Sequence, residues 1–354
     1  MAFDIKKLLQ SVVTHGASDL HLVSRSEPQI RLNGTLKPVN LPIMVGEDIE
    51  EMCYSLITEK QKQEFEEHNE LDFALLLPGI GRFRANYYKT LGVIAAAFRI
   101  IPIEIPSLDD LGAPEVYKRL IKREKGLILV TGPTGSGKST TLAAMLNEIN
   151  LTEHKHVVTV EDPVEFIHLN KKSVFSHRGV GDDTKSFAAA LKYAMRQDPD
   201  IIFIGEMRDR ETIEAGLTAA ETGHLVFGTL HTSSAPGTIN RIIDVFSGEE
   251  QPQIRAMIAS SLVAVVAQAL LPKIGGGRVA PAEVLVVNHA ISNLIREDKV
   301  HQIYSQMQLG QGNTGMTTQT QSLMKFYKDK KISREIAMQY ANKASELEIA
   351  MNKG

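Results

Sequence analysis

The segment that most constrains the fold is Gly132-Pro133-Thr134-Gly135-Ser136-Gly137-Lys138-Ser139-Thr140. It matches the phosphate-binding pattern G-x-x-x-x-G-K-[ST] at every position. The residues before it, 126–131, are typical of a short buried strand, and residues 140–146 are typical of the start of a helix. A strand, a glycine-rich loop and a helix in this order predict an α/β fold.

The chemistry of this segment predicts a bound nucleoside triphosphate. Glycines allow backbone N–H groups to curl around a phosphate chain, and the helix N-terminus adds positive potential there. Lys138 would reach the β- and γ-phosphates, and the Ser139 hydroxyl would hold Mg²⁺. A chance glycine-rich turn is disfavoured because strand, loop, lysine, hydroxyl and helix are all in register. We therefore expect ATP and Mg²⁺ as cofactors.

The composition limits the classes of protein to which the chain can belong. At 354 residues it exceeds one compact core of typical size, so two domains are expected. A formal net charge of −3 gives no sign of a polyanion-binding surface, and we expect no direct binding of nucleic acid. The single cysteine, Cys53, excludes an intrachain disulfide and a multi-cysteine zinc site, which suits a reducing cytoplasm.

The sequence predicts no transmembrane segment. Its first residues lack the apolar core of a signal peptide. The longest uncharged apolar run, residues 256–271, is shorter than the ~20 residues that a spanning helix needs. We expect this run to form a buried helix in a soluble protein.

Residue patterns divide the chain into two predicted domains. Residues 1–100 combine helical stretches with alternating strands, which predicts a small α+β domain. Prolines recur through residues 101–114 and interrupt regular structure, so this stretch is expected to be a semi-rigid linker. In residues 115–354 strands alternate with helices, the signature of a parallel sheet, and the tail from about Ser322 is helical.

Acidic residues follow two further predicted strands. Glu206 ends the apolar run 201–205, and we expect it to hold Mg²⁺ directly or through water, with a helix cap as the alternative. Glu161, Asp162 and Glu165 cluster after an earlier strand. We interpret Glu165 as the group that orients or deprotonates the attacking water, with a structural turn as the alternative.

Basic residues are candidates for sensing or neutralising the phosphates. His231 follows the predicted strand 225–230, where it could sense the γ-phosphate, although lone histidines are more often structural. Arg82, Arg84 and Arg99 belong to the first domain. They are candidates for charge compensation at the phosphates, from this subunit or a neighbour, with an exposed strand surface as the alternative.

Several segments together resemble the motifs of secretion-superfamily ATPases. Residues 132–140 resemble the Walker A motif, 159–166 the Asp box, 204–209 the Walker B motif and 222–232 the His box. Residues 16–22 and 293–297 further resemble the type IV pilus retraction subfamily. The resemblance covers essentially the whole chain, and its motifs stand in the family's order.

This resemblance implies an architecture, a site and a location. It implies a ring-shaped homohexamer of chains with a PAS-like N-terminal domain and a RecA-like ATPase core, in which ATP turnover drives domain movements that pull pilin subunits out of the pilus base. It makes Glu165 the Asp-box glutamate, Glu206 the Walker B glutamate and the three arginines residues that face nucleotide. With Lys138 and His231, these are the expected catalytic residues. It also implies an inner-membrane platform protein as partner and a cytoplasmic protein, peripheral at the pilus base.

One position departs from the family's pattern. The family's segment usually reads alanine-isoleucine-arginine-asparagine-leucine-isoleucine-arginine-glutamate, and here Ser292 replaces the first arginine in residues 290–297. A serine cannot make the charged contacts of an arginine. The sequence therefore does not establish which surface contacts the partner at this position. ATP turnover is expected to be unaffected.

Two other functions stay open at this stage. Pilus-assembly and type II secretion ATPases of the same superfamily usually carry a four-cysteine zinc-binding insertion and a longer N-terminal region. One cysteine and a first domain of about 100 residues disfavour them. A regulatory protein that binds ATP without turnover is disfavoured because both candidate acids, Glu165 and Glu206, are present.

Overall fold

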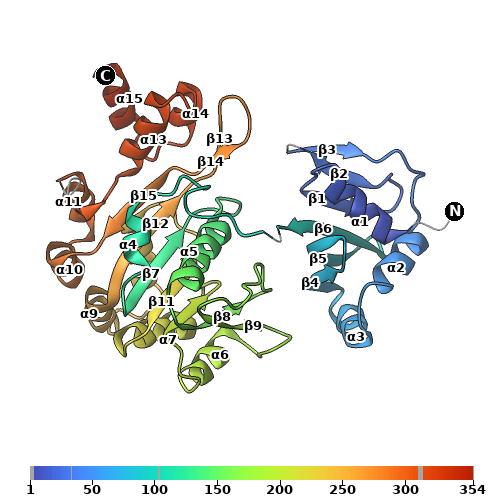
Figure 1. Ribbon diagram of the computed structural model, residues 1–354, viewed down its shortest axis with the longest axis horizontal. Coiled ribbons are helices and arrows are strands. Elements are labelled where there is room, and N and C mark those ends of the chain that lie inside the picture. Colours follow the sequence, from blue (N-terminus) through green and yellow to red (C-terminus); the bar gives the residue numbers. More distant parts are fainter. Residues whose placement is uncertain (1–3, 33, 103, 310–313, 354) are drawn as a thin grey trace. The chain divides into compact units, whose positions relative to one another are not determined.

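Figure 1 shows the computed structural model, which describes residues 4–32, 34–102, 104–309 and 314–353. The chain forms two compact units. The first consists of the residues up to Glu104 together with Pro163–Ile167. The second consists of Ile105–Asp162 and the residues from His168 onward.

The first unit is built on a six-stranded antiparallel sheet with the strand order β3-β2-β1-β6-β5-β4. Buried and half-buried side chains alternate along β5, so Phe83, Ala85 and Tyr87 lie in the core while Arg82 and Arg84 lie on the other face. Helices α1, α2 and α3 add apolar side chains to this core. The elements are α1 (Ile5–Thr14), β1 (Asp19–Leu22), β2 (Gln29–Leu32), β3 (Thr35–Pro38), α2 (Gly46–Tyr54), α3 (Glu59–His68), β4 (Glu70–Leu77), β5 (Gly81–Thr90) and β6 (Val93–Ile101).

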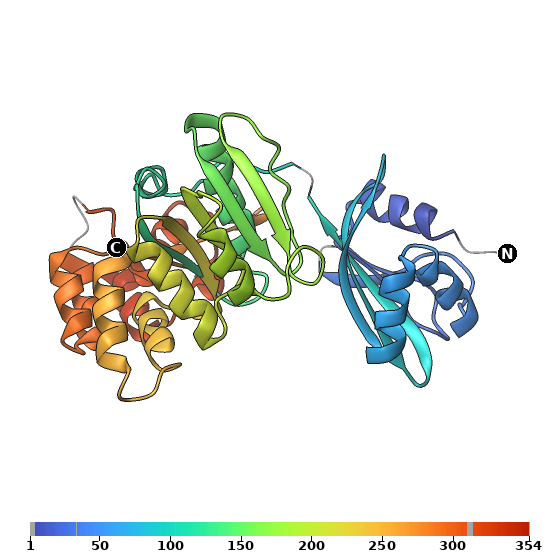
Figure 2. The same cartoon turned by 90° about the horizontal axis from the view of Figure 1, so that it is seen from below.

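A seven-stranded sheet with the order β15-β12-β7-β11-β10-β8-β9 forms the centre of the second unit (Figures 1 and 2). Its strands are parallel except β15, which is antiparallel to β12. Leu127 and Leu129 of β7 pack into one apolar layer with α7, α8 and α9, and Ile128 and Val130 pack into the other with α4 and α5. The α/β class that the sequence predicts is confirmed.

The elements of the second unit have the following bounds. The strands are β7 (Gly126–Thr131), β8 (His156–Glu161), β9 (Val174–Gly179), β10 (Ile201–Ile204), β11 (Leu225–Leu230), β12 (Leu262–Gln268), β13 (Leu271–Pro272), β14 (Arg278–Val279) and β15 (Ala282–Val286). The helices are α4 (Val116–Leu120), α5 (Lys138–Thr152), α6 (Phe187–Ala194), α7 (Arg210–Glu221), α8 (Ala235–Ile243), α9 (Gln251–Ser261), α10 (His289–Arg296), η1 (Val300–Gln302), α11 (Ile303–Leu309), α13 (Gln319–Lys328), α14 (Arg334–Gln339) and α15 (Ala344–Lys353).

The expectation of one buried helix across residues 256–271 is wrong. Helix α9 ends at Ser261, and the next residues form β12, which is buried along its whole length. This strand pairs with β7 on one side and β15 on the other. The β-branched side chains of Val263, Val265 and Val266 suit a strand, but a fully buried strand has no alternation that distinguishes it from a helix.

Both ends of the second unit contain buried apolar side chains. Leu108, in the proline-containing stretch predicted as a linker, is buried in the same apolar cluster as Tyr117, so this part of the stretch packs with the second unit. Near the C-terminus, α13, α14 and α15 enclose a small core with Leu271, and the predicted helical tail is confirmed. In the ranges that the structure describes, no helix combines the length and apolar character needed to cross a membrane.

Candidate nucleotide site

The phosphate loop lies between β7 and α5, at the carboxyl end of a central strand. Its glycines adopt the left-handed backbone region, with φ of 145° at Gly132, 79° at Gly135 and 87° at Gly137. Helix α5 begins at Lys138, and its N-cap is Gly137, which has no side chain to occupy the first N–H groups. These N–H groups and the helix dipole together form a site suited to an anion.

Lys138 folds back along this loop. Its Nζ atom donates hydrogen bonds of 2.8 Å to the carbonyl oxygen of Gly132 and 3.1 Å to that of Pro133. Lys138 and Ser139 are both half-buried in the first turn of α5. The loop therefore places an ammonium group and a hydroxyl at the N-terminus of one helix, as the sequence predicts.

Glu206 follows β10 at the same edge of the sheet. The preceding Gly205 donates a 2.7 Å hydrogen bond to the carbonyl oxygen of Val160, and a Cβ atom there would lie 3.1 Å from the Cα of Glu161. A side chain at this position would therefore need its neighbours to shift by a few tenths of an ångström, and Glu206 follows this tightly packed strand end. Its side chain is 19% exposed.

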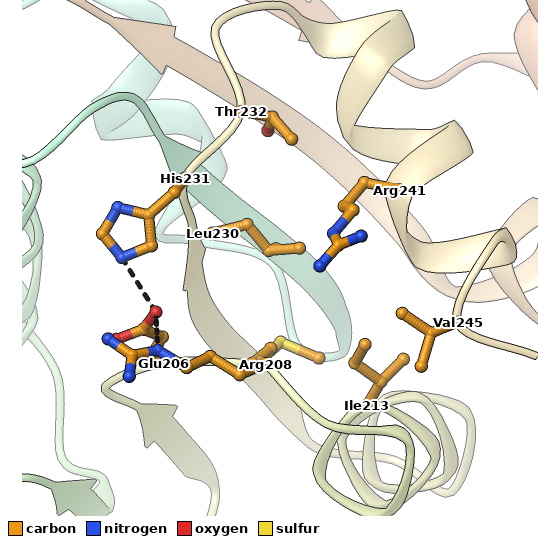
Figure 3. Close-up of a pocket in the computed structure, with 9 residues that line it drawn as sticks. Glu206, Arg208, Ile213, Leu230, His231, Thr232, Arg241 and Val245 are labelled. Atoms are coloured by element: carbon orange, nitrogen blue, oxygen red, sulfur yellow. Dashed lines mark hydrogen bonds and ion pairs between the residues drawn. The ribbon is translucent and has the colours of Figure 1, made fainter.

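Glu206 contacts two basic residues (Figure 3). Its Oε1 atom lies 2.8 Å from Nε2 of His231, which follows β11, and Arg208 donates to the same oxygen through Nε. Strands β10 and β11 are parallel neighbours, with Ile204 opposite Gly228, and this register brings the glutamate and the histidine together. Glu206 and His231, which follow two different strands, are thus in direct contact.

A cavity of about 420 Å³ opens beside this pair. The polar side of its lining comes from Glu206, Arg208, His231, Thr232 and Arg241, and the apolar side comes from Met207, Ile213, Leu230 and Val245. Figure 3 shows the side chain of Arg241, from α8, directed toward this cavity. Sequence reasoning missed Arg208 and Arg241 as site residues, although Arg208 stands within the segment 204–209 that marks the Walker B motif.

The oxygen donors at the site suit Mg²⁺. Ser139 offers a hydroxyl and Glu206 a carboxylate, which are hard ligands of the kind that Mg²⁺ prefers. Among the described residues no group of three or more histidine, cysteine or acidic side chains could hold a metal ion by itself. This pattern suits a metal that takes one or two ligands from protein and the rest from phosphate and water.

Glu165 belongs to the first unit, where it meets two of the predicted arginines. Arg82 donates hydrogen bonds to the backbone carbonyl oxygens of Val164 (2.6 Å) and Glu165 (3.2 Å). Arg84 forms a 2.8 Å ion pair with Asp72, and its Nη1 atom lies 3.9 Å from Oε1 of Glu165. The segment after β8 is therefore held by the outward face of β5.

Arg99 has a different partner from the other two arginines. Its Nε atom donates a 2.8 Å hydrogen bond to Asp19, whose side chain is only 7% exposed. Burial raises the pKa of Asp19, but hydrogen bonds from Ser18 and Arg99 and the charge of Arg99 outweigh it, so that the pKa is lowered. Arg99 thus stabilises a buried carboxylate of its own unit, and its role toward nucleotide stays a prediction.

Ser292 lies between two helices. Its hydroxyl donates a 2.7 Å hydrogen bond to the carbonyl oxygen of Ala259, which joins α10 to α9. Ser292 is half-buried, whereas Asn293, Arg296 and Glu297 are exposed. The residue that departs from the family's pattern therefore serves helix packing in this chain.

A phosphate loop on a central parallel strand, with an acid and a histidine at the ends of the next two strands, defines a P-loop ATPase with an α/β core. The family described as type II/IV secretion system protein matches residues 1–337, and the chain belongs to this family.

Individual relatives match nearly the whole chain. The type IV pilus retraction ATPase PilT of Pseudomonas aeruginosa is 49% identical over 338 residues, which cover 96% of this chain and 98% of the relative. A twitching motility protein of Neisseria gonorrhoeae is 45% identical over 348 residues, covering 98% of this chain and 93% of that protein. A crystal structure of the pilus retraction motor PilT with bound ADP matches with a TM-score of 0.90 and 48% identity, over 98% of this chain and 99% of that one.

Proposed function

We propose that this protein is an ATP-hydrolysing motor that powers the retraction of type IV pili. The observation that carries the proposal is the near-complete match to pilus retraction ATPases, at 49% identity over 96% of the chain. The phosphate loop and the Glu206–His231 pair supply the chemistry that such an activity needs.

The residues of the second unit have separate tasks in this mechanism. The ammonium group of Lys138 leaves the loop carbonyls and neutralises charge on the β- and γ-phosphates, while the N–H groups at the start of α5 bind phosphate oxygens. Ser139 and Glu206 would hold Mg²⁺, which when bound reduces the charge on the phosphate oxygens. His231, held by Glu206, senses whether the γ-phosphate is present.

Glu165 is the water-activating group of the proposed mechanism. Glu165 orients or deprotonates the attacking water, and Arg82 fixes its backbone while Arg84 lies near its carboxylate. We assign residues 1–100 to a PAS-like domain, 101–114 to a linker and 115–354 to a RecA-like ATPase domain. In a homohexameric ring, Arg82, Arg84 and Arg99 would complete the charge compensation at the phosphates.

The location and partners belong to the same proposal. Such a motor works in the cytoplasm as a peripheral protein at the inner-membrane base of the pilus, where it contacts the platform protein. A pilus-assembly or secretion ATPase is the second candidate, but the single cysteine leaves no ligand set for that class's four-cysteine zinc insertion. A regulatory protein that binds ATP without turnover is disfavoured, because both Glu165 and Glu206 are present.

Two experiments separate these functions. Phosphate release by the purified protein, with Lys138→Ala as the negative control, distinguishes an ATPase from a protein that only binds ATP. Deletion of the protein in its host, followed by counts of surface pili, distinguishes the direction of the motor. Pili that accumulate and no longer shorten support retraction, whereas loss of pili supports assembly and contradicts the proposal.

A further inference from the structure

Gln268, the last residue of β12, contacts the phosphate loop. Its side chain is buried, and its Nε2 atom donates a 2.7 Å hydrogen bond to the carbonyl oxygen of Ser136. Strands β12 and β7 are parallel neighbours with Ala267 opposite Thr131, so their carboxyl ends lie side by side. The sheet itself therefore places Gln268 against the loop.

The backbone of Gln268 touches the other end of the loop. A Cβ atom at Gly132 would lie 2.3 Å from the carbonyl oxygen of Gln268, closer than atoms can approach. A Cβ atom at Gly137 would lie 3.1 Å from Nε2 of the same residue. One residue of β12 thus borders both the first and the last glycine of the phosphate loop.

We propose that Gln268 is a positioning residue that aims the N–H group of Gly137 at the phosphates of the nucleotide, an inference that rests on the proposed nucleotide binding. The carbonyl of Ser136 and the N–H of Gly137 belong to one peptide unit. Because a trans peptide directs these two groups oppositely, the bond that holds the carbonyl toward Gln268 holds the N–H away from it. Loop N–H groups oriented in this way are the donors that bind phosphate.

The side chain of Ser136 does not help to orient the peptide unit between Ser136 and Gly137. The Oγ atom of Ser136 is buried and has no hydrogen-bond partner within the described part of the chain. If the amide donor of Gln268 is lost, the carbonyl of Ser136 can turn toward the phosphates, where its partial negative charge opposes binding. The main effect then falls on nucleotide affinity.

Replacement of Gln268 by methionine tests the proposal, because methionine has a similar length and no amide donor. We expect Gln268→Met to raise the Kd for a fluorescent ADP analogue, measured by equilibrium titration of the purified full-length chain, by about tenfold. Gln253→Met is the matched control, because Gln253 is exposed on α9, and its Kd should equal that of the parent protein. Thermal unfolding followed by circular dichroism shows whether both variants fold.

A second variant distinguishes positioning from packing. In Gln268→Glu a protonated carboxyl can donate to the Ser136 carbonyl, but a carboxylate cannot. As the pH is lowered from 8 to 6, the ratio of the Kd of Gln268→Glu to that of the parent protein should therefore decrease. The corresponding ratio for Gln268→Met should stay constant. A Kd for Gln268→Met within twofold of the parent overturns the inference, as does a pH-independent ratio for Gln268→Glu. Absence of ADP binding by the parent protein would instead overturn the proposed function.

Discussion

Nε2 of His231 lies 2.8 Å from Oε1 of Glu206, at the carboxyl ends of two strands that are neighbours in the central sheet. Arg208 donates to the same oxygen through Nε. The two basic side chains thus hold the carboxylate that would bind Mg²⁺. This arrangement connects the histidine, which can respond to the γ-phosphate, to the acid that would hold the metal.

Glu206→Gln removes the charge of this carboxylate but keeps an oxygen that can accept from His231 and Arg208. We expect kcat for ATP hydrolysis to fall by about 100-fold, because the amide is a poor ligand for Mg²⁺.

Glu165→Gln should lower kcat by at least as much while leaving nucleotide affinity nearly unchanged, as a water-activating role requires. Steady-state phosphate release and titration with nucleotide measure both quantities.

Glu211→Gln is the matched control for these two variants, because Glu211 is exposed in the first turn of α7. Its kcat should equal that of the parent protein. If Glu206→Gln leaves kcat unchanged and Glu165→Gln abolishes turnover, the assignment of Glu206 to the metal is wrong. The assignment of Glu165 as the water-activating group then still holds.

Lys138→Ala should reduce ATP turnover by at least ~100-fold, because it removes the only side chain of the loop that can bring a positive charge to the phosphates. Lys192→Ala, on the exposed side of α6, is the control for loss of a lysine charge elsewhere. Phosphate release is measured for both variants after circular dichroism has shown native helix content. Near-normal turnover of Lys138→Ala would remove the phosphate loop from the mechanism.

Local patterns account for the parts of the site that sequence reasoning found. The phosphate loop is recognisable because its strand, glycines, lysine and helix are contiguous, and Glu206 is recognisable because it directly ends an apolar run. Each of these patterns is formed by residues that are close together in the sequence. The structure keeps the local geometry that they predict.

The contacts that the sequence does not predict join residues that are far apart in the chain. The contact between Gln268 and Ser136 depends on β12 lying beside β7, whereas the residue pattern of the run that contains β12 predicts a helix. Its continuous apolar character carries no period, so only the partners on both sides determine that it is a strand. The pairing of Arg82 with the segment around Glu165 likewise joins residues far apart in the sequence.

His168 predicts a loss of stability in acid. Its ring stacks on Phe175 with centroids 4.6 Å apart, and its buried Nδ1 atom has no hydrogen-bond partner among the residues that the structure describes. Burial, with smaller contributions from the charges of His177 and Lys171, lowers the pKa of His168 from 6.5 to about 3. The unfolded chain therefore binds more protons than the folded chain between these pH values, and stability falls as the pH falls through this window.

The size of this effect follows from the same two pKa values. Between pH 7 and pH 5 His168 should cost about 2 kcal/mol of the free energy of unfolding. His168→Phe keeps the stacked ring and cannot take up a proton, so it should lose less stability over this range in urea titrations. His301→Phe, at an exposed site, is the control and should behave as the parent protein does. An equal acid sensitivity of His168→Phe and the parent would show that this imidazole is not responsible.

Glu283, on β15, joins the starts of two helices inside the second unit. Its Oε1 atom accepts a 2.8 Å hydrogen bond from the N–H of Ala235, the first residue of α8, and Oε2 accepts one of 3.3 Å from the N–H of Gln319, the first residue of α13. Burial raises the pKa of Glu283, and the two backbone donors only partly oppose this. Helix α8 directly follows the loop that carries His231, so this carboxylate links the start of α8 to the C-terminal helices.

Glu283→Leu leaves the buried N–H of Ala235 and the half-buried N–H of Gln319 without their acceptor, and we expect it to lower the free energy of unfolding by about 2–5 kcal/mol. Glu283→Gln keeps one acceptor oxygen but turns an NH₂ group toward the other helix, so its loss should be intermediate. Urea titrations of the two variants and the parent measure this series. A leucine variant as stable as the parent would show that the two helix starts do not depend on this carboxylate.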